Sequence, residues 1–148
     1  MRINKFLVYL VFLLPWFISG LIFKVDTPYY LSLNLPWFAP EPIVFGIVWP
    51  VLYILIAYSI YKTWNNSSSN YKIYLIINYV SNQLFTWVFF ILKNNFLALV
   101  DTIIVLISSM YLYVEIKALD EDKAKYLIPY IVWNIFALIL VFTIFIIN

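Results

Sequence analysis

Five long apolar stretches, separated by short polar or proline-containing segments, dominate the sequence. A transmembrane helix needs about 20 mostly apolar residues. We expect such helices at approximately residues 6–23, 43–61, 73–92, 96–114 and 126–147. The strands of a membrane barrel would alternate polar and apolar residues, and these stretches do not. The sequence therefore predicts an all-α integral membrane protein, with residues 1–148 forming a single domain of five transmembrane helices.

The composition supports a membrane protein and narrows its chemistry. Hydrophobic residues make up 66% of the chain and charged residues 11%, whereas soluble domains carry about a quarter charged residues. The chain has no histidine and no cysteine, which removes the usual general base, the thiolate nucleophile and the commonest metal ligands. A net charge of +2 does not indicate nucleic-acid binding. We expect no metal site, no bound cofactor, no nucleic-acid partner and no conventional catalytic motif.

Basic residues are concentrated at one end of the predicted helices. One side holds Arg2, Lys5, Lys62, Lys72, Lys117, Lys123 and Lys125, and the other holds Lys24 and Lys93. Because basic loops stay in the cytoplasm, we expect a cytoplasmic N-terminus and an external first loop. The abundance of Ile, Asn, Lys, Tyr and Phe is typical of an AT-rich genome, so we expect a multi-pass protein of a bacterial inner membrane.

The connection between the first two predicted helices is the one long loop. Residues 24–42 carry four prolines, with aromatic residues between them: Pro28, Tyr29, Tyr30, Pro36, Trp37, Phe38, Pro40 and Pro42. Proline lowers the entropy lost when a loop becomes ordered, and the aromatic rings need apolar surroundings. The pattern predicts a lid folded over the end of the bundle. The alternative, an interfacial aromatic belt, explains the Trp and Tyr residues but not the prolines.

Aromatic and proline residues form an ordered series of motifs along the chain. Residues 30–40 read YLSLNLPWFAP, and residues 45–53 read FGIVWPVLY. Asn82, the Phe89-Phe90 pair and the ALVD sequence at 98–101 follow, and the series ends with PYIVW at 129–133 and Phe136-Ala137. In this order and spacing the motifs resemble the TspO/translocator protein family, also called the peripheral benzodiazepine receptor family. The resemblance spans nearly the whole chain.

The resemblance implies a five-helix bundle whose first loop closes a pocket for porphyrins and related aromatic ligands. Members of the family bind protoporphyrin IX and synthetic isoquinoline-type ligands, and animal members bind cholesterol. By position, Tyr30 matches the family's loop tyrosine, Trp49 and Trp133 its pocket tryptophans, Asn82 its pocket asparagine and Asp101 its fourth-helix acid. A homodimer is also implied by the family alone.

The chain departs from the family pattern at several positions. The family's Pro-Pro pair is interrupted here by Glu41, Phe85 stands where tryptophan is common, and Val141 replaces a usual asparagine. The cholesterol-recognition segment of animal members is missing after Phe142. Sterol binding is therefore not expected from this segment.

The third predicted helix carries the strongest polar signal within a span. Asn78 and Asn82 lie one helical turn apart, and Phe85 and Phe89 continue their face. Such amides either bond neighbouring helices together or face a cavity. Likewise, Trp49 and Trp133 can pack the bundle or stack on a ligand, and Asp101 can be structural or face the ligand. The candidate ligand-binding residues are Tyr30, Trp37, Pro40, Trp49, Tyr53, Asn78, Asn82, Phe85, Phe89, Asp101, Trp133 and Ala137.

Three functions fit this reading. The first is a membrane receptor or carrier for protoporphyrin IX-like tetrapyrroles and related planar aromatic ligands, with a role in porphyrin transport or stress sensing. The second is an enzyme that degrades porphyrin in light, in which the photo-excited ligand and oxygen supply the oxidising power. The third is a lipid- or sterol-binding scaffold.

Overall fold

The computed structural model describes residues 4–148, and it contains the five predicted membrane-spanning helices. The spans are Lys5–Ile22, Pro42–Asn66, Ser69–Ile91, Asn95–Leu119 and Glu121–Ile147. No strand occurs between residues 4 and 148. The prediction of an all-α bundle with five spans is therefore confirmed. Arg2, which contributes to the predicted orientation, lies outside the described residues.

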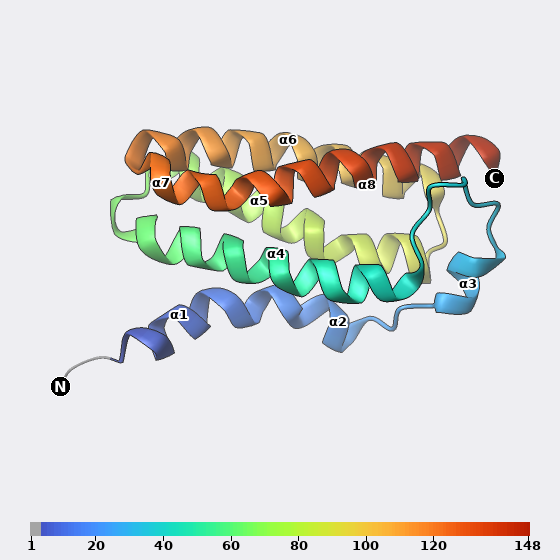
Figure 1. Ribbon diagram of the computed structural model, residues 1–148, viewed down its shortest axis with the longest axis horizontal. Helices are drawn as coiled ribbons and strands as arrows, with labels where there is room; N and C mark the ends of the chain where they lie inside the picture. The colour runs from blue at the N-terminus through green and yellow to red at the C-terminus, as the bar shows by residue number, and fades with distance from the viewer. Residues whose placement is uncertain (1–3) are drawn as a thin grey trace.

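Several spans are built from more than one helical segment. In chain order the elements are α1 (Lys5–Leu13), a 3₁₀ turn (Leu14–Phe17), α2 (Ile18–Ile22), α3 (Thr27–Ser32), α4 (Pro42–Thr63), a 3₁₀ turn (Trp64–Asn66), α5 (Ser69–Thr86), a π-helical segment (Trp87–Ile91), α6 (Asn95–Leu119), α7 (Glu121–Ala124), a 3₁₀ turn (Lys125–Leu127) and α8 (Ile128–Ile147). Figure 1 shows the spans lying side by side along the long axis, with α3 beyond one end of the bundle near the C-terminus. α1 packs on α4, α2 on α5, α5 on α6, and α6 on α8.

The polarity of the bundle is that of a protein surrounded by lipid. Large aliphatic side chains such as Ile76, Ile103 and Ile139 are exposed, whereas the amides of Asn78 and Asn134 are fully buried. Polar side chains inside a membrane face the bundle interior, where they find partners. An integral multi-pass membrane protein follows from this arrangement.

The first span is interrupted in its middle and is held there by α5. Pro15 has no backbone N–H, and the chain tightens into a 3₁₀ turn around it. The Tyr79 hydroxyl donates to the Pro15 carbonyl over 2.8 Å, and the Gln83 amide nitrogen donates to the Trp16 carbonyl over 3.1 Å. The Gln83 amide oxygen accepts from the Ser19 N–H over 2.8 Å. The Pro15 carbonyl also accepts from the Ile18 N–H, so the α5 side chain that takes the place of missing backbone partners is Gln83, which bonds the Trp16 carbonyl and the Ser19 N–H.

The short turn that precedes α6 contains one residue, Lys93, in the left-handed backbone conformation. Lys93 has φ 51°, a conformation that is uncommon for residues with a side chain. The Asn94 side chain then caps α6 by accepting a hydrogen bond from the Leu97 N–H over 2.9 Å. This geometry places the Lys93 ammonium 3.2 Å from an Asp26 carboxylate oxygen, so the turn is also joined to the first loop.

The end of the fourth span was predicted too early. The expected helix ended near residue 114, and the charged residues that follow were assigned to a loop, but α6 continues to Leu119. Asp120 has extended backbone angles and caps α7 through the Lys123 N–H. Glu115 lies on the helix and accepts a hydrogen bond from the Ser68 hydroxyl, which itself caps α5. α6 therefore ends at Asp120, which caps the next helix, and not at Glu115, the first charged residue after the apolar run.

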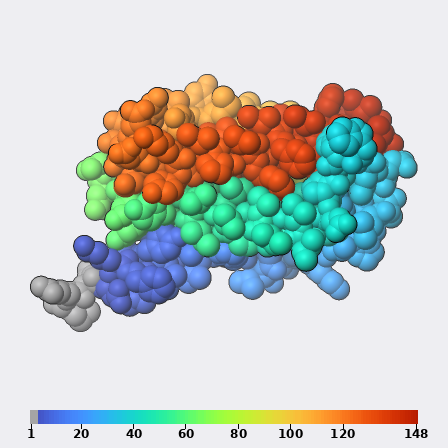
Figure 2. All heavy atoms as spheres, in the orientation of Figure 1, coloured from blue at the N-terminus to red at the C-terminus, as the bar shows by residue number. Residues whose placement is uncertain are grey.

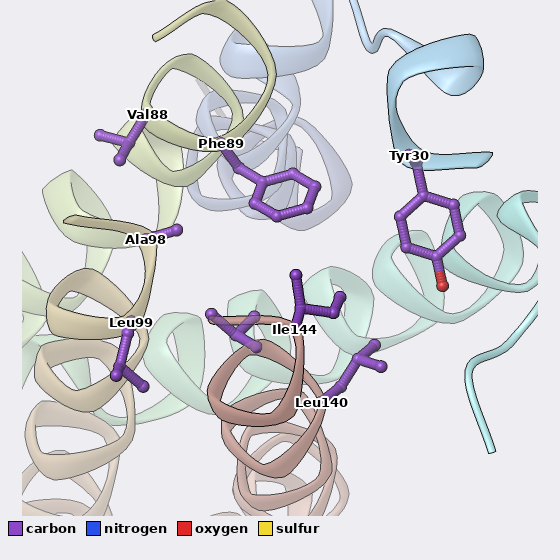
Figure 3. Packing of buried hydrophobic residues seen from close by; sticks show 8 residues of the cluster. Tyr30, Val88, Phe89, Ala98, Leu99, Leu140 and Ile144 are labelled. Atoms are coloured by element: carbon purple, nitrogen blue, oxygen red, sulfur yellow. The ribbon is translucent and has the colours of Figure 1, made fainter. Parts of the chain in front are cut away.

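Packing differs between the two ends of the bundle. At the end away from α3, Tyr71, Leu112, Ile116 and Leu127 form a closely packed buried cluster. At the α3 end, a second cluster joins α3, the π-helical segment, α6 and α8, and Figure 3 shows Tyr30, Phe89, Leu140 and Ile144 directed toward one region. The cavity described below lies at this second end.

Candidate ligand-binding site

A cavity of about 450 Å³ lies among α2, α3, α4, α5, α6 and α8. This volume falls within the range of roughly 300–1,000 Å³ typical of small-molecule sites. Most of the wall is apolar, and its aromatic members are Trp16, Phe17, Tyr30, Phe45, Trp49, Tyr53, Phe85, Phe89, Phe90 and Trp133. A cavity with this wall suits a flat, largely apolar molecule.

Aromatic rings of α4 and α8 contact one another in the cavity wall. The Trp49 and Trp133 ring centroids are 6.4 Å apart at an interplanar angle of 86°. Trp49 also lies 5.7 Å from Tyr53, and Trp133 lies 6.1 Å from Phe45. These separations are within the range of favourable aromatic pairs. The two tryptophans therefore hold one another in place while lining the cavity.

Backbone features of α4 and α5 also shape the wall. Pro50 lies inside α4 and cannot donate to the carbonyl of Gly46, and both residues line the cavity. In α5 the π-helical segment adds a wider turn, which is often found at functional sites. The consecutive residues Phe89 and Phe90 both line the cavity in this segment. Near the wall, the Gly46 carbonyl therefore lacks its usual helical donor. The π-helical turn lets both Phe89 and Phe90 line the cavity.

A chain of hydrogen bonds connects the cavity wall to the bundle interior. The Asn82 amide oxygen accepts from the Tyr53 hydroxyl over 2.9 Å and from the Gln83 amide over 3.1 Å. The Asn82 nitrogen donates to the Tyr130 hydroxyl over 3.3 Å, and this hydroxyl donates to the Asn78 oxygen over 2.9 Å. These two bonds occupy both lone pairs of the Asn82 amide oxygen. For a ligand, Asn82 has only its remaining N–H available.

Asn78 has a different role from Asn82. Its amide nitrogen donates to the Val105 carbonyl over 2.9 Å and to the Ser108 hydroxyl over 3.0 Å, both on α6. Its side chain is fully buried and lies outside the cavity wall. Asn78 therefore bonds α5 to α6 and does not face the cavity. Asn82 bonds neighbouring helices and also lines the cavity.

The first loop covers the cavity through Tyr30. We call residues 24–41, which connect α2 to α4 and include α3, the lid. Tyr30 is buried and lines the cavity, and its hydroxyl donates to the Pro40 carbonyl over 2.9 Å. Burial raises the pKa of the Tyr30 phenol, which keeps it in the protonated, donating form. This bond closes the lid on itself, because Pro40 lies at the far end of the same segment.

Two further contacts fasten the lid at separate places. On one side the Lys93 ammonium pairs with Asp26 and lies 4.8 Å from the centre of the Tyr29 ring. On the other side Asn34 and Asn148 exchange hydrogen bonds: the Asn34 N–H donates to the Asn148 side chain over 2.8 Å, and the Asn148 amide donates back to the Asn34 carbonyl over 3.0 Å. In Figures 1 and 2 the segment after α3 passes close to the end of α8.

The lid is expected to loosen in acid. The Tyr29 N–H, which donates to the carboxylate over 2.9 Å, and Lys93 together lower the pKa of Asp26. A carboxyl group whose pKa is lowered by folding stabilises the structure above its ordinary pKa of about 3.9, and this contribution is lost as the pH falls through the lowered value. Spin labels on Leu31→Cys and Leu92→Cys should therefore give a broader distance distribution at pH 2 than at pH 7.

The control for this prediction removes the titrating group. Asp26→Asn should give the broad distribution at both pH values, because the ion pair with Lys93 is absent throughout. Identical distributions at pH 2 and pH 7 in the protein with Asp26 would contradict the prediction. The chain has no cysteine of its own, so the two labels report only on these sites.

The structure brings together most of the candidate residues named from the sequence. The cavity wall includes Tyr30, Trp49, Tyr53, Asn82, Phe85, Phe89, Trp133 and Ala137. Pro40 contributes through its carbonyl bond to Tyr30, and Asn78 through its contacts with α6. Asp101 is buried outside the wall. Trp37 is 96% exposed and packs only its edge against Phe38, so this ring points away from the cavity.

Several wall residues were not among the sequence candidates. Trp16 and Ser19 reach the cavity because the first span is interrupted, and Pro15 was the available signal for that interruption. Asn134 lines the cavity next to Trp133 although neighbouring residues on a helix point about 100° apart. A polar residue in an otherwise apolar span was the available signal for Asn134.

Comparison with known proteins gives one family over nearly the whole chain. The model of the TspO/MBR family matches residues 7–147. A protein of Bacillus cereus called "Tryptophan-rich protein TspO" is 35% identical over 136 residues, which cover 90% of this chain and 89% of the relative. An Archaeoglobus fulgidus protein with the same description is 32% identical, with 81% of this chain and 80% of the relative covered. A Bacillus subtilis protein described as "Uncharacterized membrane protein YtaB" is 34% identical, with 85% and 84% covered.

Proposed function

Because the chain belongs to the TspO/MBR family, we propose that it is a membrane receptor or carrier that binds tetrapyrroles such as protoporphyrin IX, and related planar aromatic ligands, beneath the lid. The observation that carries this proposal is the 450 Å³ cavity, whose wall includes Trp49, Phe85, Phe89 and the lid residue Tyr30. Apolar cavities with a few polar groups are typical of small-molecule sites. A role in porphyrin transport or stress sensing would follow from binding and release through the lid.

The aromatic wall supports a flat ring rather than a flexible chain. Phe85 and Phe89 are stacked, with centroids 5.4 Å apart and an interplanar angle of 11°, and they offer an aligned pair of rings. Trp49 and Trp133 offer further aromatic surface on the facing helices α4 and α8. Contact between aromatic rings adds to the free energy gained by burying apolar area.

Porphyrin titration of the protein in lipid nanodiscs, in the dark, tests the proposal. Saturable quenching of tryptophan fluorescence with a one-to-one endpoint is expected. Absence of saturable binding would overturn the proposal. Added phospholipid or sterol should not displace the porphyrin; displacement by either would favour the lipid- or sterol-binding scaffold instead.

A light-dependent porphyrin-degrading enzyme is the second candidate function. It is favoured by the two oxidisable indole rings of Trp49 and Trp133 in the cavity wall. The same titration, repeated under illumination with oxygen present, separates the two functions. Loss of the porphyrin absorption bands only in the presence of intact protein would support the enzyme, and an unchanged spectrum would favour the receptor or carrier.

The proposed orientation places the lid outside a bacterial inner membrane and the N-terminus in the cytoplasm. It follows from the basic side chains at the ends of the spans: among the described residues Lys62, Lys72 and Lys117 lie on one side, and Lys93 lies with the lid on the other. In intact cells a membrane-impermeant thiol reagent should label Leu31→Cys and not Ser67→Cys. The reverse pattern would contradict this orientation.

A further inference from the structure

The chain has only two glycines, and both line the cavity. They are Gly20 in α2 and Gly46 in α4. Glycine inside a helix is less favourable than alanine, so a helical glycine usually serves a special backbone conformation or a close approach. Neither glycine has a positive φ. The backbone conformation therefore does not require glycine at either position.

Close packing of helices does not require these glycines either. In membrane proteins glycine commonly lets two helix backbones come into contact. A Cβ atom added to Gly20 or to Gly46 would have no atom of the neighbouring described elements within 4 Å. Both residues are exposed. The space beside them is therefore open, and the lack of a side chain keeps it unobstructed.

The two glycines lie at the border between the cavity wall and the lipid-facing surface. At about 100° per residue around a helix, Gly46 lies between Trp49, which lines the cavity, and Ile47, which is exposed. Gly20 directly precedes Leu21, which is also exposed. α1 packs on α4, whereas α2 packs on α5. The gap between the α2 and α4 borders is therefore not filled by packing of these two helices.

The surroundings of this gap are apolar. Both glycines belong to membrane-spanning helices, and the exposed side chains beside them, Leu21 and Ile47, are aliphatic. None of the described residues that line the cavity is charged, and moving an unpaired charge through such surroundings is costly. The gap therefore suits uncharged molecules that are already dissolved in the bilayer.

The lid can stay fastened while a ligand passes this gap. Two of the contacts that hold the lid are the Asp26–Lys93 ion pair and the hydrogen bonds between Asn34 and Asn148. They join the lid to the turn before α6 and to the end of α8, and neither contact involves α2 or α4. Passage between α2 and α4 therefore breaks neither of them.

We infer that the gap between α2 and α4, with Gly20 and Gly46 at its edges, is a side opening through which uncharged planar ligands enter the cavity from the bilayer. The inference rests on the proposed function and deepens it, because it names membrane-dissolved, uncharged ring compounds as the class that is taken up directly. Exchange with water, including that of ligands with ionised groups, is left to the lid. The side opening and the lid thus connect one cavity to two different phases.

Phenylalanine at each glycine tests the side opening. Gly20→Phe and Gly46→Phe each place a ring where the structure has open space. An octaalkyl porphyrin, which is uncharged and stays in lipid, is incorporated with the protein into the same vesicles and kept in the dark. Relaxation of tryptophan quenching after a temperature jump, at several porphyrin-to-lipid ratios, gives the association and dissociation rate constants without transfer through water.

Each variant should slow association and dissociation together, by at least about 10-fold, because an obstacle on the route raises the barrier equally in both directions. The dissociation constant, which is the ratio of the two rate constants, should therefore change far less than either of them. Leu21→Phe is the matched control, since it adds the same ring to the exposed face of α2. This control should keep both rate constants of the unaltered protein.

A closed lid provides a test that leaves both glycines in place. In the double variant Asn34→Cys with Asn148→Cys, a short bifunctional thiol reagent can join the lid to the end of α8, and the chain has no other cysteine. Uptake of the octaalkyl porphyrin from the bilayer should continue at the same rate after cross-linking. This comparison remains decisive even if a glycine variant does not fold.

The outcomes separate this inference from the proposed function. Unchanged rate constants in both glycine variants, or loss of uptake when the lid is cross-linked, would overturn the side opening and leave tetrapyrrole binding intact. A weaker dissociation constant with an unchanged association rate would also overturn it, because the glycines would then belong to the binding surface and not to the route. Absence of saturable porphyrin binding by the unaltered protein would overturn both.

Discussion

Replacing both Trp49 and Trp133 with alanine is expected to weaken porphyrin binding by about 100-fold. Each indole supplies a large apolar surface to the cavity, and an aromatic contact contributes about 0.5–1.5 kcal/mol beyond the area it buries. Loss of two such rings therefore removes about 3 kcal/mol, and every 1.4 kcal/mol corresponds to a factor of ten in affinity. Titration with an octaalkyl porphyrin, whose substituents make no hydrogen bonds, measures the effect on ring contacts alone.

The chain provides a matched tryptophan for the control. Trp37 lies on the lid but points away from the cavity, with 96% of its surface exposed. Trp37→Ala should change the dissociation constant less than threefold, although it removes the same kind of side chain. If the Trp49 and Trp133 double variant keeps its affinity within threefold, or if Trp37→Ala loses as much affinity as the double variant, the cavity is not the porphyrin site.

Gln83→Leu is expected to destabilise the protein by about 3 kcal/mol. The Gln83 amide pairs with the Ser19 N–H, the Trp16 carbonyl and the Asn82 side chain, all in a buried setting. Leucine fills a similar volume but satisfies none of these groups, and each buried group left unpaired costs about 1–3 kcal/mol. The free energy of unfolding, measured by denaturant titration in one detergent, should report the loss.

A lipid-facing substitution on the same helix serves as the control for Gln83→Leu. Ile77→Leu, at an exposed position of α5, should change the free energy of unfolding by less than about 0.5 kcal/mol. Equal stability of Gln83→Leu and the unaltered protein would mean that other groups satisfy the interrupted first span. The bonds that Gln83 makes to Trp16 and Ser19 would then be dispensable.

The number and the approximate limits of the spans could be predicted from the sequence because apolar length alone decides which segments cross a bilayer. Pro15 signals an interruption of the first span, but the α5 side chains that bond to it could not be predicted, and neither could the π-helical segment, because both depend on how neighbouring helices pack. The end of α6 at Leu119 was missed because Glu115 and Lys117 interrupt the apolar run, although Ile116 between them is buried and the helix continues to the Asp120 cap.

Helical spacing could place some of the candidate residues on one face of the third span. Asn82, Phe85 and Phe89 line the cavity as the third-helix pattern indicates. Asn78 shares their side of the helix by spacing, yet it is directed to α6, because the rotation of a helix against its neighbours is set by packing. The outward direction of Trp37 depends on the turn around it, and spacing within a loop carries no such information.

The interrupted first span has a consequence for the biogenesis of the protein. The Trp16 carbonyl and the Ser19 N–H lack their Gln83 partner in hydrocarbon until a span made much later in translation arrives. During synthesis the amino-terminal segment should therefore stay beside the insertion machinery, or near water at the interface, rather than partition alone into lipid. Its final integration is expected to wait until the third hydrophobic segment has left the ribosome.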